Sequence, residues 1–410
     1  MNGMSSKEKK NIDSEISDIK LNSLLEITKA INNNFSVDQL LEIFKEVLET
    51  KLKIEKLVLF SHDIKGWKCI LKYGVSGDCD IIDIEKDLLT KNEIGPIKFS
   101  DPLINNVFDI VIPVFHKKQP LAYVLIGDSE HKIELSPSYQ HLDFVQTLTS
   151  VIVVAIENKK LAKENIRQAG MKKELELASE MQTMLFPAIL PNDSKIDAAA
   201  FYLPHHQVGG DYYDFSWLNE NECAFCVADV SGKGVAAALL MSNFQANLRI
   251  LFNRTSSLSK LIRVLNTIVM ETAKGEKFIT FFIAKYNFLT HTLTYINAAH
   301  NPPILVTNNA TTLLKKGCIG LGMFNKIETI EEGVIQIEPN STIVCYTDGL
   351  VELENDAGED FGIERLQKII EINPKKDMNS LNELIVESII KYKQKKPYID
   401  DITLFSVKLH

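Results

Sequence analysis

VGGDYYDF at residues 208–215 and FCVADVSGKG at residues 225–234 decide how the second half of this chain folds. Each stretch joins an aspartate, Asp211 or Asp229, to glycines and to β-forming residues. The run at 225–227 is typical of a buried strand. A carboxylate at the end of such a strand is costly unless it is paired, hydrogen-bonded or metal-bound. Adjacent glycines let the backbone turn tightly and approach closely.

Two more aspartates lie beside apolar runs, and one of them is next to a glycine. IVCYTDGLVE at residues 343–352 presents Asp348, and IDDITLFSV at residues 399–407 presents Asp400. Together the four stretches predict a cage of carboxylates. Hard oxygen ligands without a histidine or cysteine cluster suit Mg²⁺ or Mn²⁺ better than Zn²⁺.

Composition limits the class of protein. A chain of 410 residues with 45% hydrophobic residues favours two or three domains with sizeable cores. The first fifteen residues have no apolar signal core, and no stretch approaches the ~18 uninterrupted apolar residues that a membrane helix needs. The net charge of −9 argues against a general affinity for nucleic acid. We therefore expect a cytoplasmic protein that binds neither membrane nor nucleic acid.

The six cysteines show no disulfide framework, which fits a reducing compartment. Cys223 and Cys226 form the closest pair. They lie in a predicted strand, where residues three apart point to opposite faces. We expect structural cysteines, because a zinc or redox site would need a second ligand pair.

The N-terminal part predicts an α/β domain over residues 14–157. A helix is expected at 21–32, and the Ser36 to Gln39 capping box opens a second one. Strands are expected at 56–60, 67–73, 108–115 and 121–126. FDIVIPVFHKKQPLAYVLIGD at 108–128, two strands joined by a polar turn at 116–119, resembles a GAF sensory domain. That resemblance names no ligand or partner.

Residues 140–184 contain no proline and one glycine, Gly170, so they favour one long helix or two helices broken near that glycine. The apolar residues of this helical segment recur at near-heptad spacing and so approximate a seam. This spacing predicts a parallel homodimer formed through a helical linker at residues 158–190. Alternatively, the part before Glu157 packs on the sheet of its own domain. The seam consists of Val145, Leu148, Ile152, Ala155, Ala162, Ile166 and Ala169.

The third predicted domain covers residues 191–410. Strands are expected at 198–203, 222–228, 278–286, 292–298, 304–306, 341–346 and 402–408, and helices at 235–252, 258–273, 363–372 and 381–392. Strands outnumber helices and several are joined as hairpins. An α+β fold with antiparallel sheets flanked by helices is therefore favoured over a doubly wound parallel sheet.

Five ordered blocks carry a resemblance: GGD-x-x-D, ADVSGKGVAAALLMS, NAAHNPP, YTDGLVE and DDITL. Their order over residues 172–410 resembles the bacterial PPM-type serine/threonine phosphatases of the sporulation stage II and stress-sigma-factor regulator group. The resemblance implies an α/β/β/α sandwich whose entry helix, at 173–191, connects sensor to catalytic core. It also implies hydrolysis of phosphoserine or phosphothreonine on a STAS-type anti-sigma-factor antagonist.

The resemblance further implies two Mn²⁺ or Mg²⁺ ions that activate a water molecule. Asp229 would bridge them, and the carbonyl of Val230 would bind one. Asp211 would bind on one side, with Asp348 and Asp400 on the other. These four aspartates are the predicted catalytic residues.

Other polar residues are possible outer groups of the site. Asp401 is expected to support a ligand or cap the strand, whereas Asp214 is either an exposed turn acid or an outer-shell group. Ser231 stands where the eukaryotic branch has a histidine, which leaves the general acid open. His300 is either that acid or, preferably, a turn-organising hydrogen-bond donor.

Some residues invite other interpretations. His205 and His206 are expected in a surface loop. The SGKG segment lacks the spacing of a phosphate-binding loop. The alternatives to an enzyme of this kind are a noncatalytic scaffold that keeps the phosphatase fold and, less favoured, a nucleotide cyclase. A scaffold would be expected to lose one of the four aspartates, and all four are present.

Overall fold

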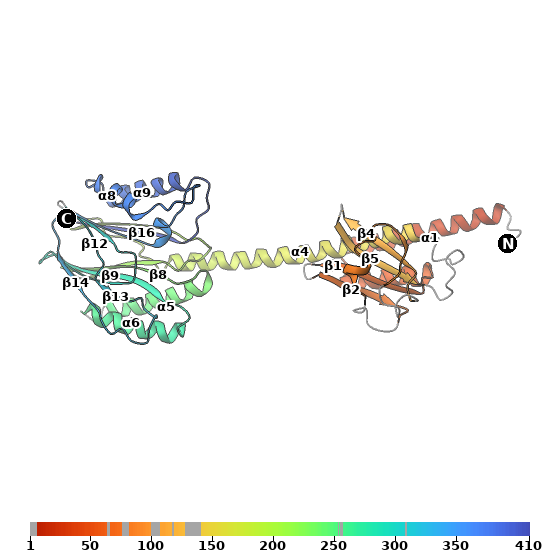
Figure 1. Ribbon diagram of the computed structural model, residues 1–410, viewed down its shortest axis with the longest axis horizontal. Coiled ribbons are helices and arrows are strands. Elements are labelled where there is room, and N and C mark those ends of the chain that lie inside the picture. Colours follow the sequence, from red (N-terminus) through yellow and green to blue (C-terminus); the bar gives the residue numbers. More distant parts are fainter. Residues whose placement is uncertain are drawn as a thin grey trace. The chain divides into compact units, whose positions relative to one another are not determined.

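The computed structural model describes residues 6–63, 66–75, 82–99, 107–116, 119–127, 141–252, 254, 257–307 and 310–410. The chain divides into two compact units, Met1–Ala169 and Gly170–His410. The division falls inside α4 (Leu142–Thr183), which continues unbroken past Gly170 (Figure 1). The single long helix is therefore the correct alternative for this segment. The boundaries predicted at 157/158 and 190/191 stay predictions.

The first unit contains one antiparallel sheet with the strand order β2-β1-β5-β4-β3. Gln39 N–H donates to Ser36 Oγ and Ser36 N–H to Gln39 Oε1, so the predicted capping box is present. The turn predicted at 116–119 includes residues 117–118, which lie outside the described residues. The elements are α1 (Ser6–Asn32), α2 (Val37–Glu46), a π-helical turn (Val47–Lys51), β1 (Lys56–Asp63), β2 (Gly66–Tyr73), α3 (Ile84–Asp87), β3 (Gly95–Pro96), β4 (Ile110–His116) and β5 (Gln119–Gly127).

Both faces of this sheet are buried. Leu57 and Leu59 of β1 pack in a core with residues of α1, α2 and α4, whereas Val58 and Phe60 pack in a second core. Because successive strand residues point to opposite faces, one strand serves both cores. The start of α4 contributes Val145, Leu148 and Ile152 to the first core. The alternative that this part of the seam packs on its own domain is therefore correct.

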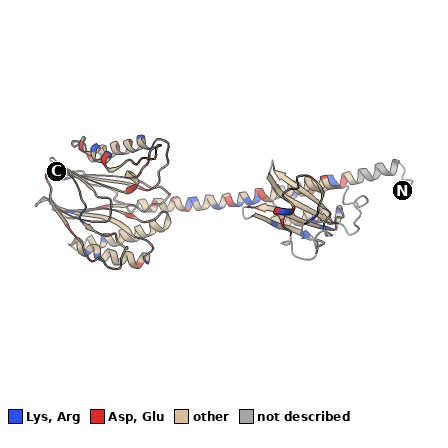
Figure 2. Ribbon diagram, in the orientation of Figure 1, with Lys and Arg blue, Asp and Glu red and all other residues tan. Residues whose placement is uncertain are grey.

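The middle of α4 differs from its start. Leu161 and Ile166 are 51% and 74% exposed. Lysine, arginine and glutamate recur along this stretch (Figure 2). An apolar side chain in such a charged segment stays exposed unless a further surface covers it.

The second unit consists of two sheets with helices on their outer faces (Figure 1). The strand orders are β13-β10-β9-β8-β7, with β14 also on β10, and β12-β11-β15-β16-β6. Helices α5 and α6 cover the first sheet, and α8 and α9 cover the second. The predicted α/β/β/α sandwich is confirmed, with one correction: β13 pairs with β10 in parallel.

The strands of this unit are β6 (Ile196–Leu203), β7 (Tyr212–Asn219), β8 (Glu222–Val230), β9 (Ile279–Asn287), β10 (Thr292–Ala298), β11 (Ile304–Val306), β12 (Thr311–Leu313), β13 (Gly317–Cys318), β14 (Gly333–Gln336), β15 (Ser341–Tyr346) and β16 (Ile402–Leu409). The helices are α5 (Val235–Phe252), α6 (Leu258–Ala273), α7 (Asp348–Val351), α8 (Ile363–Glu371) and α9 (Met378–Lys393).

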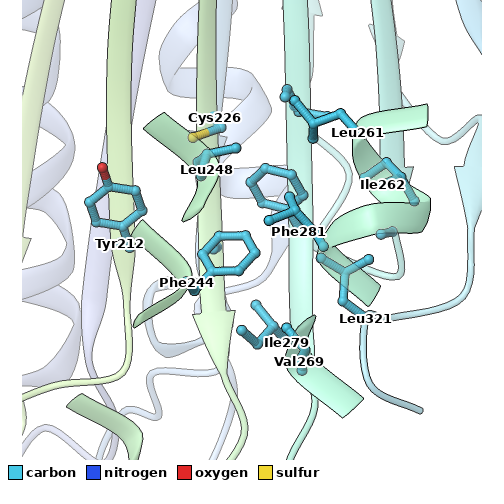
Figure 3. Packing of buried hydrophobic residues seen from close by; sticks show 14 of the residues in the cluster. Tyr212, Cys226, Phe244, Leu248, Leu261, Ile262, Val269, Ile279, Phe281 and Leu321 are labelled. Atoms are coloured by element: carbon cyan, nitrogen blue, oxygen red, sulfur yellow. The ribbon is translucent and has the colours of Figure 1, made fainter. Parts of the chain in front are cut away.

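The core between the helices and the first sheet is built from large side chains. Phe244 and Leu248 of α5 and Leu261 of α6 pack with Phe281 of β9 (Figure 3). Among the described residues, α5 is the one helix that is long and apolar enough to cross a membrane by length and composition. Its packing in this core accounts for that composition.

Strand β8 lies between two cores. Cys226 belongs to the core under α5, and Cys223 belongs to the core between the sheets. Both thiols are free and buried. The prediction that these two cysteines face opposite sides of a strand is confirmed.

Candidate active site

The four predicted aspartates lie at one end of the two sheets. Asp211 precedes β7, and Asp229 is near the end of the antiparallel neighbour β8, where Tyr212 pairs with Ala228. Asp348 begins α7 just after β15, and Asp400 precedes β16, which pairs antiparallel with β15. Each sheet therefore contributes one antiparallel strand pair, β7–β8 or β15–β16, and two of the four aspartates lie at the end of each pair.

Asp211 ties the two sheets together. Its Oδ2 accepts hydrogen bonds from Thr347 Oγ1 at 2.8 Å and from Thr403 Oγ1 at 2.6 Å. The N–H of Thr403 in turn donates to Thr347 Oγ1 at 2.9 Å. The carboxyl group is 2% exposed, and burial, followed by the charge of Asp229, raises its pKa well above the ordinary range. Hydroxyl donors hold this group in place without neutralising it.

Asp229 and Asp348 are also partly buried near other carboxylates, which raises their pKa values. Burial raises the pKa of Asp229 to about 7, and the charges of Asp348 and Asp400 add to the shift. Burial and the charge of Asp400 also raise the pKa of Asp348. Acids that shift one another in this way lie close together and favour a cation between them.

Asp401 has a different function from its neighbour Asp400. Its two oxygens accept the N–H groups of His205 at 2.7 Å and Gly210 at 2.6 Å. It therefore fixes the loop that leads to Asp211. This contact agrees with a supporting position, but a role of Asp401 toward a metal stays a prediction.

The last turns of α4 contact the same loop. The side-chain amide of Gln182 donates to the carbonyl of Gly209 at 2.7 Å and accepts the Gly209 N–H at 3.1 Å. A side chain at Gly209 would force Tyr202 or Asp401 to shift, because a Cβ atom there would lie 2.1 Å from Tyr202 Oη and 2.4 Å from Asp401 Oδ2. The glycine thus lets the loop lie close to both side chains.

Ser231 is a structural part of the turn after β8. Its Oγ accepts the N–H of Phe278 at 2.9 Å, and its own N–H donates to the carbonyl of Phe278 at 2.9 Å. The carbonyl of Val230, the predicted backbone ligand, faces Gly210: a Cβ atom on that glycine would lie 2.9 Å from it. The structure therefore brings Val230 to the loop before Asp211.

His300 is buried beside the site. Its Nδ1 lies 2.9 Å from Thr280 Oγ1, and Thr280 is the cross-strand neighbour of Asp229. The backbone N–H of His300 donates to Asn297 Oδ1 at 2.7 Å. Burial lowers the pKa of the imidazole to about 4, so the ring is neutral at neutral pH. These contacts favour the turn-organising role.

Asp214 is not an exposed turn acid, so that alternative is wrong. It lies in β7 with its side chain 2% exposed, and Arg249 Nε of α5 is 2.8 Å from its Oδ2. The Tyr212 hydroxyl also donates to it. Arg249 further donates to the carbonyl of Leu185, just after α4, at 3.1 Å. Sequence reasoning missed this pair, because nothing local to Asp214 indicates a partner 35 residues away.

The donor set fits a hard divalent cation, although the geometry is not that of a closed site. Among the described residues, no three His, Cys, Asp or Glu side chains converge on a single point at metal-binding distance. The chemistry is nonetheless suitable, because carboxylates raise one another's pKa in a buried setting that provides mainly hydroxyl donors. Two residues that the sequence left unassigned also reach the site, Gln182 through Gly209 and Lys233 through Asp400.

The match to a known protein family lies within the second unit. The family described as Stage II sporulation protein E (SpoIIE) matches residues 219–410. This range includes Asp229, Asp348 and Asp400, and Asp211 precedes it. Among curated proteins, phosphoserine phosphatase RsbU of Bacillus subtilis is 29% identical over 247 residues, which are 59% of this chain and 71% of RsbU.

Two further relatives match over different lengths. Protein IcfG of Synechocystis is 24% identical over 381 residues, 84% of this chain and 58% of IcfG, so the chain spans less than two thirds of that relative. The SiaA-PP2C domain of Pseudomonas aeruginosa is similar in structure, with a TM-score of 0.52 at 18% identity over 60% of this chain and 99% of that domain. At that identity the likeness supports the fold.

The pair of Asp214 and Arg249 gives the first testable prediction. Arg249→Met should lower the free energy of unfolding of the second unit by about 2–3 kcal/mol, because Asp214 is left buried without its cation. The loss stays below that of a fully buried pair because the Arg249 side chain is 44% exposed. The double variant Asp214→Asn/Arg249→Met should regain part of it. Scanning calorimetry of the three proteins checks this, and equal destabilisation of the single and double variants would contradict it.

Proposed function

We propose that the protein is a divalent-cation-dependent serine/threonine phosphatase, because residues 219–410 match the family described as Stage II sporulation protein E. Two Mn²⁺ or Mg²⁺ ions would be its cofactors, and a phosphoserine or phosphothreonine of another protein its substrate. The name of RsbU, a phosphoserine phosphatase, supports the class of reaction.

One observation carries the cation requirement. Asp211, Asp229 and Asp348 come from three separate segments, and burial and neighbouring acids raise the pKa of each. A buried group of like charges is unfavourable unless protons or cations compensate it. At neutral pH a divalent cation compensates two carboxylates without leaving either of them protonated.

We assign one group of residues to cation binding and a second group to the orientation of a ligand. Asp211, Asp229, Asp348 and Asp400, with the carbonyl of Val230, would hold the cations. When bound, two such ions supply an activated water and neutralise the charge of a phosphoryl group. Thr347 and Thr403 would orient Asp211 through the hydroxyl bonds to its Oδ2.

Residues around the ligands would set the shape of the site. Asp401 would keep the loop before Asp211 in position through its two backbone contacts. The Ser231 hydroxyl, bonded to the Phe278 N–H, would shape the turn after Asp229. His300 would support Thr280 beside Asp229 as a neutral ring.

Substrate and regulation follow by analogy. The substrate would be a phosphorylated STAS-type antagonist of an anti-sigma factor, and the GAF-like first unit would regulate the phosphatase in a cytoplasmic homodimer. Two features support control through α4: the helix is shared by both units, and its Gln182 binds the loop of Asp211. A noncatalytic scaffold is the outcome if no phosphate ester is hydrolysed.

Loss of a proposed ligand tests the activity. Asp229→Asn or Asp348→Asn should lower Mn²⁺-stimulated turnover of p-nitrophenyl phosphate by more than about a hundredfold, since even outer partners of a metal site are worth 10–100-fold. The protein should stay folded, because the change removes charge and little apolar surface. The control is Asp356→Asn, an exposed acid in the same unit. Wild-type turnover by either site variant would remove the assignment.

The pKa of Asp229 gives a test that needs no turnover. Its folded pKa of about 7 lies above the ordinary value, so the folded state holds a proton that the unfolded chain releases near pH 4. That contribution to stability is complete below about pH 4 and is lost as the pH rises through about 7. The Tm of the metal-free protein should therefore fall between pH 5 and pH 8.

Mn²⁺ should raise the Tm more at pH 8 than at pH 5, because protons compete for the same carboxylates. In Asp229→Asn both effects should shrink. Scanning calorimetry with and without Mn²⁺ measures them. An equal Mn²⁺ effect at both pH values would place the cation elsewhere.

The dimer is tested on α4. Ile166→Lys should shift the full-length protein toward monomer, because it puts a charge on the proposed apolar seam. The matched control Gln168→Lys, on the same exposed stretch, should leave the dimer intact. Light scattering at tens of micromolar reports the mass, and a monomeric wild-type chain would refute the dimer.

A further inference from the structure

A lysine lies at the rim of the acidic site and has no role in the reaction described so far. Lys233 belongs to the turn between β8, which carries Asp229, and α5. Its Nζ lies 2.8 Å from Asp400 Oδ2 and also donates to the carbonyl of Ile399. The side chain is 42% exposed, so the ammonium group is held in position while part of it faces solvent.

The turn that carries Lys233 is itself anchored. Lys277 Nζ donates to the carbonyl of Ser231 at 2.8 Å, and the Phe278 N–H donates to the Ser231 hydroxyl. Gly232 has a φ of +83°, and a Cβ atom there would lie 2.4 Å from Lys277 Nζ. Lys277 is therefore committed to the turn, and Lys233 is the lysine presented to the acids.

The positive charge of Lys233 acts on two aspartates, Asp400 and Asp348. It opposes the rise in the pKa of Asp348, so its field extends beyond its contact with Asp400. An ammonium group has three N–H donors. The carbonyl of Ile399 and the carboxylate of Asp400 account for two of them, which leaves one donor for a further acceptor.

A phosphorylated serine has a charge of about −1.5 to −2 and three acceptor oxygens. Such a group must approach a site formed by carboxylates, and a fixed cation at the rim offsets part of the repulsion. We propose that Lys233 binds a phosphoryl oxygen of the substrate and is a substrate-binding residue of the proposed phosphatase reaction, on which this inference rests.

A purely structural salt bridge predicts different behaviour. If Lys233 only steadied Asp400, its loss would change cation binding and stability but not the affinity for phosphate once the cation is saturating. If it binds the phosphoryl group, its loss weakens both the ester and inorganic phosphate at saturating cation. The structural role and the phosphate-binding role therefore predict different values of KM for the ester and of Kd for inorganic phosphate.

The experiment uses the full-length protein at Mn²⁺ concentrations shown to saturate each variant. Lys233→Gln should raise the KM for p-nitrophenyl phosphate and the Kd for inorganic phosphate by about tenfold, the effect of losing one charge-assisted hydrogen bond, with a smaller change in kcat. Lys233→Arg should recover most of the affinity. The control for net charge is Lys375→Gln, an exposed residue of the same unit, which should resemble wild type.

Calorimetric titration with inorganic phosphate separates this inference from the proposed function. A wild-type protein that binds phosphate through Lys233 but hydrolyses no ester would support the inference and overturn the function. Equal phosphate affinity in wild type and Lys233→Gln, or no phosphate binding by the wild type, would overturn the inference whatever the turnover.

Discussion

Repulsion among carboxylates at the shared end of two packed sheets is the constraint around which the second unit is arranged. Thr347 and Thr403 donate hydroxyl bonds to Asp211, and Lys233 pairs with Asp400. Hydroxyl donors orient a carboxylate, but they do not cancel its charge. The rigid sandwich therefore holds acids together that would separate if the strands were free to move. In the function proposed above, this repulsion would be what favours the binding of a divalent cation.

Two aspartates three residues apart show how environment decides the use of a residue. Asp214 lies inside β7 and has the guanidinium of Arg249 as a partner, so its charge is compensated within the protein. Asp211 lies just before the same strand and has hydroxyl partners and a second acid beside it. The first is part of the packing between sheet and helix. The second has no cationic partner among the hydrogen bonds described above, which is consistent with its proposed role as a metal ligand.

The sequence predicted the elements whose signals are local. Val235–Phe252, Thr292–Ala298 and Ser341–Tyr346 were expected with the bounds observed, because each is an apolar run bounded by turn residues. β7 was missed, since Asp214 and Ser216 interrupt its apolar pattern and the motif before it suggested a turn. β14 was missed because its pairing with β10 depends on a partner far along the chain.

The candidate site followed the same rule: residues with a local sequence signal were predicted, and residues that depend on distant contacts were missed. The four aspartates stood out because each lies at or near the end of a strand, most of them near glycine, and the structure brings them to one end of the sheets. Gln182 had no such signal: in sequence it is one polar residue in a helix, and its contact with Gly209 arises only when the helix packs beside the loop. Lys233 was visible in SGKG, but its pairing with Asp400 joins segments 167 positions apart by number and depends on the fold.

The contact of Gln182 with Gly209 has a consequence for the long helix that bears it. The amide pairs with both backbone groups of the glycine, as a neighbouring strand would, and such pairing is sensitive to direction. Each residue of an α-helix turns its side chain by about 100° relative to the one before. The contact between Gln182 and the loop before Asp211 therefore depends on the rotational position of α4. A rotation of the helix about its own axis, with no change in its length, would break this contact while Asp401 still holds the loop.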